Sequence, residues 1–317
     1  MIKSLNRWKF TKYTLAVFNL LASMSSIIGL FYTIYEKSIN NKTAWIWGFG
    51  IVCFTAVLIA LILLMHSEKY ESWNECSKYA KGLHDILHCL RDMNKELDDL
   101  RIRDSKIEKK DFRRIITSDC IDIMNKLSRI LSESMRCKVR TCIKLNDFIK
   151  ENETDIHGIK LITFARSGNE GVNAAFKEQS NTIKVIENTD FEYIFKINEI
   201  YEENRIHYFY QKDLKKYDKK LRKESNGTKM YKNSDKHWRK RYNTTIVMPM
   251  RYLKSSNKDE ALYDIVGFLC VDAKKSGSFE NKNFYFTVEF LKGVSDILYS
   301  YLNSCITYYK SIDEEDE

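Results

Sequence analysis

Two apolar runs without a single charged side chain lie near the N-terminus and restrict what this chain can fold into. They are Tyr13–Tyr35 and Ala44–Met65, which are 23 and 22 residues long. A helix rises about 1.5 Å per residue, so about 20 apolar residues cross a hydrocarbon core of about 30 Å. A cleaved signal peptide is disfavoured, because a second run follows after only the short segment Glu36–Thr43. The pattern predicts a two-helix transmembrane hairpin at residues 1–66.

The basic residues around this hairpin predict its orientation. They lie on the side of both chain termini: Lys3, Arg7, Lys9, Lys12, Lys69, Lys78 and Lys81. The segment between the runs has only Lys37 and Lys42, partly offset by Glu36. Because basic residues favour the cytoplasmic side, we expect a cell inner membrane protein with both termini in the cytoplasm and membrane lipid as a partner.

One face of the first run is polar. Spacings of three, four and seven residues bring together Asn19, Ser23, Ser26 and Thr33. In lipid such side chains favour close helix contacts and interhelical hydrogen bonds. Two interpretations stay open: packing against the second run, or a polar seam between protomers that lines a pore in an oligomer.

The segment 67–107 has the pattern of a helical coiled-coil connector. Apolar or small residues alternate at spacings of three and four: Trp73, Cys76, Ala80, Leu83, Leu87, Leu90, Asn94 and Leu97. A single Asn at such a seam favours a parallel dimer. The pattern therefore predicts a homodimer or higher oligomer. The alternative is an amphipathic helix that packs on its own domain.

Residues 108–310 form the expected globular domain, followed by an acidic tail at 311–317. A helical stripe from Phe112 to Ile130 is followed by runs with period two, which is typical of strands. We expect strands at Val139–Leu145, Ile159–Phe164, Thr244–Leu253 and Ala261–Ala273, and a closing helix at Asn283–Tyr309. Between the strand pairs lies a long irregular insert with short helical pieces. The predicted class is α+β.

Two of these strands carry motifs that resemble the GAF domain family. The run Thr244–Met250 contains the chain's single proline, Pro249, and looks like the family's central strand. Gly267–Asp272 is similar to the Gly-x-Leu strand that follows it, and Phe279 also fits. The resemblance covers about 112–309 and implies a cytoplasmic antiparallel sheet flanked by helices. It also implies small ligands, including cyclic nucleotides, bound between sheet and insert, and dimers formed through the first and last helices.

The sequence departs from the signature of some cyclic-nucleotide-binding GAF domains. At the corresponding positions it has Ala273, Lys274, Phe279, Asn283 and Phe284. The Lys and Phe are kept, but the Asn and both acids are not. The resemblance therefore does not imply cyclic-nucleotide binding of that particular style.

The sequence contains no catalytic constellation and no phosphate-binding glycine loop. We therefore expect no enzyme activity, no metal site and no cofactor. The eight cysteines show no metal-ligand spacing, and we expect reduced thiols that mostly fill the core.

The insert carries the candidate ligand site. The segment 212–241 has 13 Lys or Arg against 4 Asp or Glu, and aromatic residues are interleaved with them. Aromatic faces and basic groups suit a planar anionic ligand such as a nucleotide. Lipid headgroups or a solvated loop with buried aromatics are the alternatives, and nothing else suggests a nucleic acid. The candidate ligand-binding residues are Arg166, Tyr208, Asp213, Tyr231, Trp238 and Arg241. Asp213 would orient a ligand group or cap a helix.

Together these features predict a membrane-anchored cytoplasmic sensor of a nucleotide second messenger that signals to its hairpin. The layout resembles the two-span effectors of nucleotide-signalled antiphage systems in bacteria. The alternative is a membrane-tethered interaction module or scaffold that recruits a partner.

Overall fold

The computed structural model describes residues 42–102, 107–146, 159–168, 171–200, 208–255, 262–280 and 284–314. It divides into two compact units, Met1–Asn74 and Glu75–Glu317. The helix α2 (Lys42–Ile102) crosses this boundary. Residues 75–102, which fall in the expected connector, therefore belong to the same unit as the sheet.

The second unit is built on one antiparallel sheet, as the α+β prediction requires. Within the described residues it has six strands in the order β3-β2-β1-β6-β5-β4. All neighbouring strands run antiparallel. The strands are β1 (Val139–Asn146), β2 (Lys160–Arg166), β3 (Thr182–Lys184), β4 (Phe209–Gln211), β5 (Thr244–Ser255) and β6 (Leu262–Ala273).

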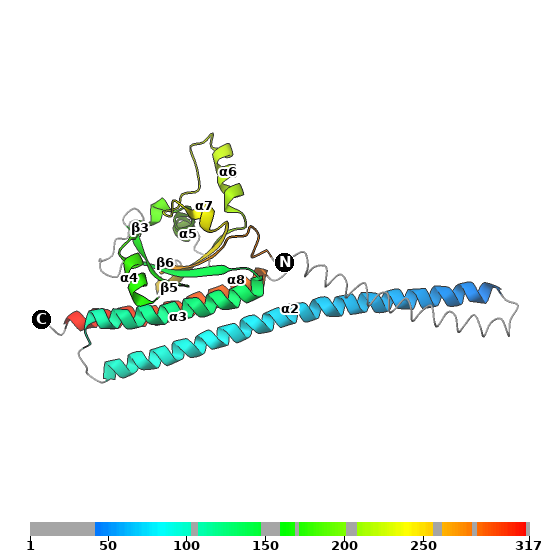
Figure 1. The fold of residues 1–317 in the computed structure, drawn as a ribbon, viewed down its shortest axis with the longest axis horizontal. Helices are drawn as coiled ribbons and strands as arrows, with labels where there is room; N and C mark the ends of the chain where they lie inside the picture. Colours follow the sequence, from blue (N-terminus) through cyan, green and yellow to red (C-terminus); the bar gives the residue numbers. More distant parts are fainter. Residues whose placement is uncertain are drawn as a thin grey trace. The chain divides into compact units, whose positions relative to one another are not determined.

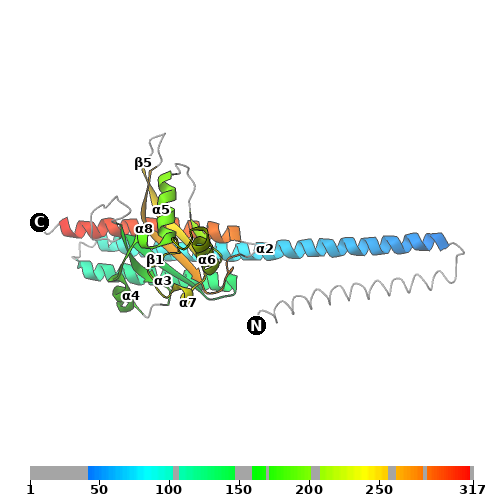
Figure 2. The same cartoon turned by 90° about the horizontal axis from the view of Figure 1, so that it is seen from above.

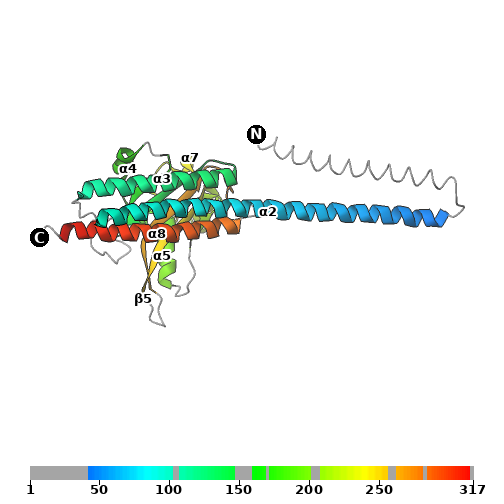
Figure 3. The same ribbon diagram turned by 90° about the horizontal axis from the view of Figure 1, so that it is seen from below.

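Successive residues of each strand point to opposite faces of this sheet, and each face is covered by different helices. One face packs against α3 (Lys109–Met135) and α8 (Phe284–Glu314), and residues 75–102 of α2 pack on these two helices on the side away from the sheet, as Figures 1 and 3 show. The other face is covered by the insert (Figures 1 and 2). The insert contains α5 (Thr189–Ile200), α6 (Leu214–Glu224) and α7 (Trp238–Arg241). At the side of the sheet, α4 (Val172–Gln179) packs on β2.

The two motifs that resemble the GAF family lie in paired strands at the centre of the sheet. Pro249 is in β5. Strand β4 pairs with β5 only as far as Val247, so Pro249 has no partner in β4. A missing N–H is therefore tolerated at Pro249. Gly267 in β6 has a different constraint, because an added Cβ would lie 2.2 Å from the Lys144 carbonyl oxygen. Phe279 is fully buried in the helix-side core.

The predicted heptad seam is divided between the inside and the outside of this unit. Leu90 and Leu97 are buried in its core, together with Tyr79 and Ile86, which the heptad pattern did not include. Leu87, by contrast, is 42% exposed. The alternative interpretation, an amphipathic helix packed on its own domain, thus describes the inner half of the pattern. A stripe with spacings of three and four serves either purpose, so the sequence could not separate them.

Hydrogen bonds at Tyr79 fix α2 to both neighbouring helices. The Tyr79 hydroxyl lies 3.0 Å from Thr287 Oγ1 of α8, and Ser134 Oγ of α3 donates to it at 2.9 Å. The Tyr79 ring also packs against Phe290, with 5.1 Å between ring centroids. Since all these groups are buried, α2 is fixed against α3 and α8 by buried contacts.

Only the second run of the predicted hairpin lies within the described residues. The run Tyr13–Tyr35 lies outside the described residues, and Ala44–Met65 falls within α2. Among the helices in the described part of the chain, none combines the length and apolarity that crossing a bilayer requires.

Candidate functional site

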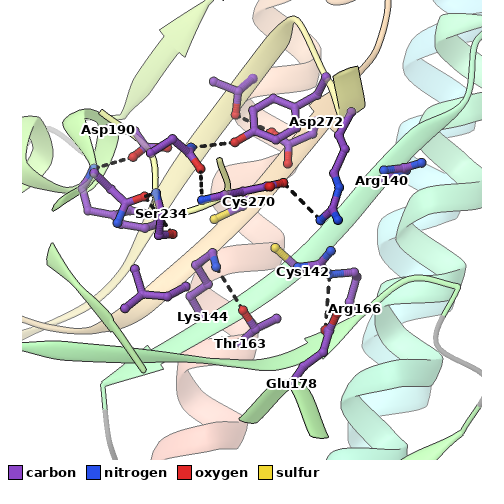
Figure 4. A pocket seen from close by; sticks show the side chains of 18 of the residues that line it. Arg140, Cys142, Lys144, Thr163, Arg166, Glu178, Asp190, Ser234, Cys270 and Asp272 are labelled. Atoms are coloured by element: carbon purple, nitrogen blue, oxygen red, sulfur yellow. Dashed lines mark hydrogen bonds and ion pairs between the residues drawn. The ribbon is translucent and has the colours of Figure 1, made fainter. Parts of the chain in front are cut away.

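A cavity of about 350 Å³ opens between the sheet and the insert (Figure 4). Its floor consists of side chains from three adjacent strands: Arg140, Cys142, Lys144, Thr163, Arg166, Cys270 and Asp272. Its rim comes from α4, the start of α5 and the segment around α7: Glu178, Asp190, Phe191, Asn233, Ser234, Asp235, Arg241 and Tyr242. The volume lies in the range of small-molecule sites.

The polar floor follows from the period of the strands. Arg140, Cys142 and Lys144 are two residues apart, so they share one face of β1. In the register between β1 and β6, Cys142 lies opposite Cys270 and Arg140 lies opposite Asp272. Charged and thiol groups are thereby gathered on a sheet whose other face is packed with apolar side chains.

Arg166 is the basic residue that enters the cavity from β2. Its Nε atom is buried and has no hydrogen-bond partner among the described residues. Glu178 Oε2 lies 3.4 Å away, which makes an ion pair without hydrogen-bond geometry. Burial lowers the pKa of the guanidinium, but the nearby negative charges, with Cys142 and Glu178 foremost, outweigh burial and raise it. Arg166 therefore remains a cation with an unused donor.

Two further cations are held by neutral or acidic neighbours. Lys144 Nζ donates to Thr163 Oγ1 at 3.0 Å. The Arg241 guanidinium forms an ion pair with Asp235 at 3.1 Å. Both basic groups line the cavity, and Figure 4 shows Lys144 and Thr163 there.

Two carboxyl groups in the cavity ionise at unusually high pH. Burial, followed by the charge of Asp272, raises the pKa of Asp190 to about 6. Burial likewise raises the pKa of Asp272 to about 6, although Thr245 Oγ1 donates to it at 2.6 Å. Asp190 accepts the backbone N–H of Phe191 at 3.1 Å. Shifted pKa values of this kind gather at functional sites.

An aromatic wall stands behind the rim of the cavity. Trp238 and Tyr231 are buried and meet edge to face, with 5.0 Å between their ring centroids. The Tyr231 hydroxyl points to Asp190 Oδ2 at 3.4 Å. The backbone of the wall is held by the buried Asp218, which accepts the Tyr231 N–H at 2.9 Å and forms an ion pair with Arg239. The wall therefore supports the carboxyl group of Asp190 without lining the cavity itself.

The structure brings together two of the six predicted ligand-binding residues. Arg166 and Arg241 line the cavity, and Tyr231 and Trp238 lie in the wall behind it. Tyr208 packs against the helix-side core on the opposite face of the sheet. Asp213 caps α6, where it accepts the Lys216 N–H at 2.9 Å.

Most of the basic segment 212–241 does not face the cavity. The lysines of α6 that project into solvent are Lys215, Lys216, Lys219, Lys220 and Lys223. Arg222 and Arg239 are bound to Asp218. Among the basic residues of this segment, Arg241 lines the cavity, while those of α6 face solvent and Arg239 is held by Asp218.

Apart from Arg166, sequence reasoning missed the floor of the cavity. The runs Val139–Leu145 and Ala261–Ala273 were predicted as strands, without attention to the charged or thiol residues at every second position: Arg140, Cys142, Lys144, Cys270 and Asp272. That alternation was the signal that could have found them. Asp190 carried no signal, because a tertiary contact brings it to the cavity. In the described part of the chain, no three His, Cys, Asp or Glu side chains gather as metal ligands would.

Comparison with known proteins finds similarity in structure alone. No family model matches the sequence, and no curated protein matches it. The chain is similar to the GAF domain of a phosphoenolpyruvate-protein phosphotransferase from Acinetobacter, at 13% identity and a TM-score of 0.34, over 72% of this chain and 97% of that one. The corresponding domain from Coxiella burnetii has 12% identity and a TM-score of 0.35, over 70% of this chain and 94% of that one. The GAF domain region of a putative membrane protein from Geobacter sulfurreducens has 16% identity and a TM-score of 0.33, over 58% of this chain and 93% of that one.

Proposed function

We propose that this chain is a ligand-sensing signalling protein whose cavity binds a small anion of the nucleotide type. The observation that carries the proposal is the Nε of Arg166, which is buried and makes no hydrogen bond although Glu178 lies at ion-pair distance, beside Lys144 in a cavity of about 350 Å³. A buried donor without a partner costs about 1–3 kcal/mol, more when it is charged. An anionic oxygen placed there would remove that cost.

The acids of the cavity favour a ligand that also carries hydrogen-bond donors. Glu178 and Asp235 are already paired with arginines. Among the described residues no basic group lies at ion-pair distance from Asp190 or Asp272, and burial disfavours the charged forms of both carboxyls. Hydroxyl or amino groups of a ligand would bond to these two carboxyls. Phosphate, ribose hydroxyls and base amino groups are combined in a nucleotide, which is why we favour that class.

Strand β1 offers a route from the cavity to the helical layer. Cys142 and Lys144 face the cavity, whereas Thr141 and Ile143 beside them are buried toward α3. Thr141 Oγ1 donates to the Met124 carbonyl of α3 at 2.8 Å. A ligand that shifts β1 would therefore also shift α3.

Helix α2 would carry the response onward. Its Tyr79 hydroxyl is bonded to Ser134 of α3 and Thr287 of α8. The same helix contains the apolar run Ala44–Met65. We propose that this run and Tyr13–Tyr35 associate with a membrane and that ligand binding alters them, as in a membrane effector of the antiphage type.

The second candidate function is a membrane-tethered module that recruits a partner. Leu87 of α2 and Tyr285 of α8 are large apolar side chains exposed on the second unit, and either could contribute to a contact with such a partner. Such side chains are typical of contact surfaces when several lie together. The sensor requires a ligand in the cavity, whereas the recruiting module does not.

Ligand binding to the full-length chain tests the proposal. The purified protein is titrated calorimetrically with adenosine and guanosine monophosphates, their cyclic forms, and inorganic phosphate. Arg166→Gln should weaken nucleotide binding about 10- to 100-fold, because a charge-assisted hydrogen bond contributes about 1.5–3 kcal/mol. Arg91→Gln, an exposed arginine of α2 that pairs with Asp92, is the matched control and should bind as the unchanged chain does. If no nucleotide binds, or if Arg166→Gln binds equally well, the cavity is not a nucleotide site.

A further inference from the structure

Two cysteines lie directly opposite each other on the floor of the cavity. Cys142 of β1 is the register partner of Cys270 of β6. Residues opposite each other in an antiparallel pair have Cα atoms about 4.5–5.5 Å apart. Disulfides span Cα separations of about 4.4–6.8 Å. The backbone therefore already holds the two residues at a distance that a disulfide bridges.

Both sulfurs can be reached through the cavity, although the protein otherwise covers them. Cys142 is 6% exposed and Cys270 is 4% exposed, and both line the cavity (Figure 4). Cys120 and Cys305 differ in this respect, since they are fully buried in the helix-side core and do not line this cavity. A small solute thus meets the first pair and not the second.

We propose that Cys142 and Cys270 form a redox-active dithiol, a modification site that peroxides convert to a disulfide. Cys142 is the attacking sulfur and Cys270 the resolving one. The site is defined by the strand register and the cavity, and it does not depend on the ligand class proposed above.

The surroundings of the pair separate the roles of the two sulfurs. The hydrogen bond from Cys270, which outweighs burial, lowers the pKa of Cys142 to about 7, and the charges of Lys144 and Arg166 act in the same direction. The hydrogen bond to Cys142, with burial, raises the pKa of Cys270. The charge of Asp272 on the same floor raises the pKa of both thiols. Because the thiolate is the nucleophile, Cys142 reacts first.

The chemistry balances with hydrogen peroxide as the oxidant. The Cys142 thiolate attacks one peroxide oxygen, the O–O bond breaks, and a sulfenic acid and hydroxide form; the hydroxide takes up the proton that the thiol released and becomes water. Cys270 sulfur then attacks the sulfenic sulfur, the S–O bond breaks, and a second water leaves with the Cys270 proton. In sum, two thiols lose two electrons and two protons, and one peroxide is reduced to two waters. An added dithiol reverses the change.

The test uses the reduced full-length chain treated with hydrogen peroxide. Remaining thiols are blocked with N-ethylmaleimide, and the digested protein is mapped by mass spectrometry. The expected product is a cross-linked peptide pair containing Cys142 and Cys270, lighter by two hydrogens and restored by dithiothreitol. Cys120 and Cys305 should stay thiols until the protein is denatured.

Variants identify which of the two sulfurs reacts first with peroxide. In Cys270→Ser, dimedone should label Cys142 as a sulfenic acid, because the resolving sulfur is absent. Cys89→Ser, which changes a partly exposed thiol of α2, is the control and should still form the cross-link. Recovery of Cys142 and Cys270 as alkylated thiols after peroxide treatment would overturn the proposal. So would further oxidation of Cys142 without a cross-link in the unchanged chain, a result that does not depend on whether any variant folds.

Discussion

The buried carboxyl of Asp190 lowers the stability of the folded chain at neutral pH. Burial and the charge of Asp272 raise its pKa from 3.8 to about 6. The folded chain therefore binds a proton more tightly than the unfolded chain does. The stabilising contribution is fully present below pH about 4 and is lost as the pH rises through about 6. Near neutral pH the chain keeps a destabilising carboxylate, which is expected of a group that serves a ligand.

Asp190→Asn should therefore make the folded chain more stable at pH 7.5. A shift of about two pKa units corresponds to a gain of at most about 3 kcal/mol, since each unit is worth about 1.36 kcal/mol. Asn keeps an acceptor for the Phe191 N–H. Urea denaturation of both proteins from pH 4 to pH 7.5 measures the effect, and the difference should shrink toward pH 4. A variant that is less stable at pH 7.5 would show that the carboxylate is paired in the folded state.

At the scale of the element, helix α2 shows which residues of an apolar stripe are buried in the core of its own unit. Leu90 is 1% exposed in the core between α2, α3 and α8, whereas Leu87, three residues earlier, is 42% exposed. Both belong to the heptad stripe in the sequence. The packing within the unit therefore requires Leu90 and leaves Leu87 for any contact outside it.

A matched pair of substitutions on this helix separates the two roles. Leu90→Ala should lower the free energy of unfolding by about 2–5 kcal/mol, the cost of a core Leu→Ala change. Leu87→Ala should change it by less than about 0.5 kcal/mol at concentrations where the chain is monomeric. Thermal or urea unfolding of the full-length chain provides the measurement. Equal losses for both variants, growing with protein concentration, would instead show that the stripe forms an interface between copies.

The elements that the sequence predicted are those with long, regular periods. The four principal strands and the helices α3 and α8 were expected close to their observed positions, because apolar residues recur there at period two or at spacings of three and four. The strands β3 and β4 were missed, since three residues are too few to show a period. The insert was expected to be irregular with short helical pieces; α6 forms there, with Asp213 as its N-cap, which is one of the two roles that the sequence left open for this residue.

The candidate site was less predictable than the fold. Arg166 and Arg241 were chosen for their charge, and they do meet at the cavity. Tyr208 was chosen for the same aromatic and basic composition but lies on the other face of the sheet, because the start of β4 directs it to the helix side. Composition identifies the kind of group that a ligand needs, and only the register of the strands decides which side chains reach it.

On the scale of the whole molecule, the unit from Glu75 onward is layered: a helical layer, the sheet, and the insert that covers the cavity. The sheet belongs to both cores, because alternate side chains of β1, β5 and β6 are buried on opposite faces. A change at the cavity floor therefore has a direct neighbour in the helical layer, as the Thr141 hydrogen bond to α3 illustrates. The first unit contains a different feature, an apolar part of α2 with large side chains exposed: Phe54, Val57, Leu58, Leu61, Ile62, Leu63 and Met65.

These exposed side chains lead to the last prediction, which concerns the membrane. Apolar surface of this extent needs a lipid or protein cover, and the charge-free run Ala44–Met65 favours lipid. The full-length chain should therefore sediment with membranes and resist extraction with alkaline carbonate. Leu58→Arg combined with Ile62→Arg should release it, because each arginine in a hydrocarbon core costs about 2.5–3.5 kcal/mol on insertion scales.

Leu87→Arg is the matched control, since it places the same charge at an exposed position of the same helix beyond the apolar run. That variant should remain in the membrane fraction. Extraction of the unchanged chain by carbonate would assign the apolar side chains to a protein contact, and the recruiting module would then become the preferred function. Retention of the unchanged chain together with release of the double variant would leave the cavity and the membrane segment joined by one helix, α2. That arrangement is what a sensor acting on a membrane requires.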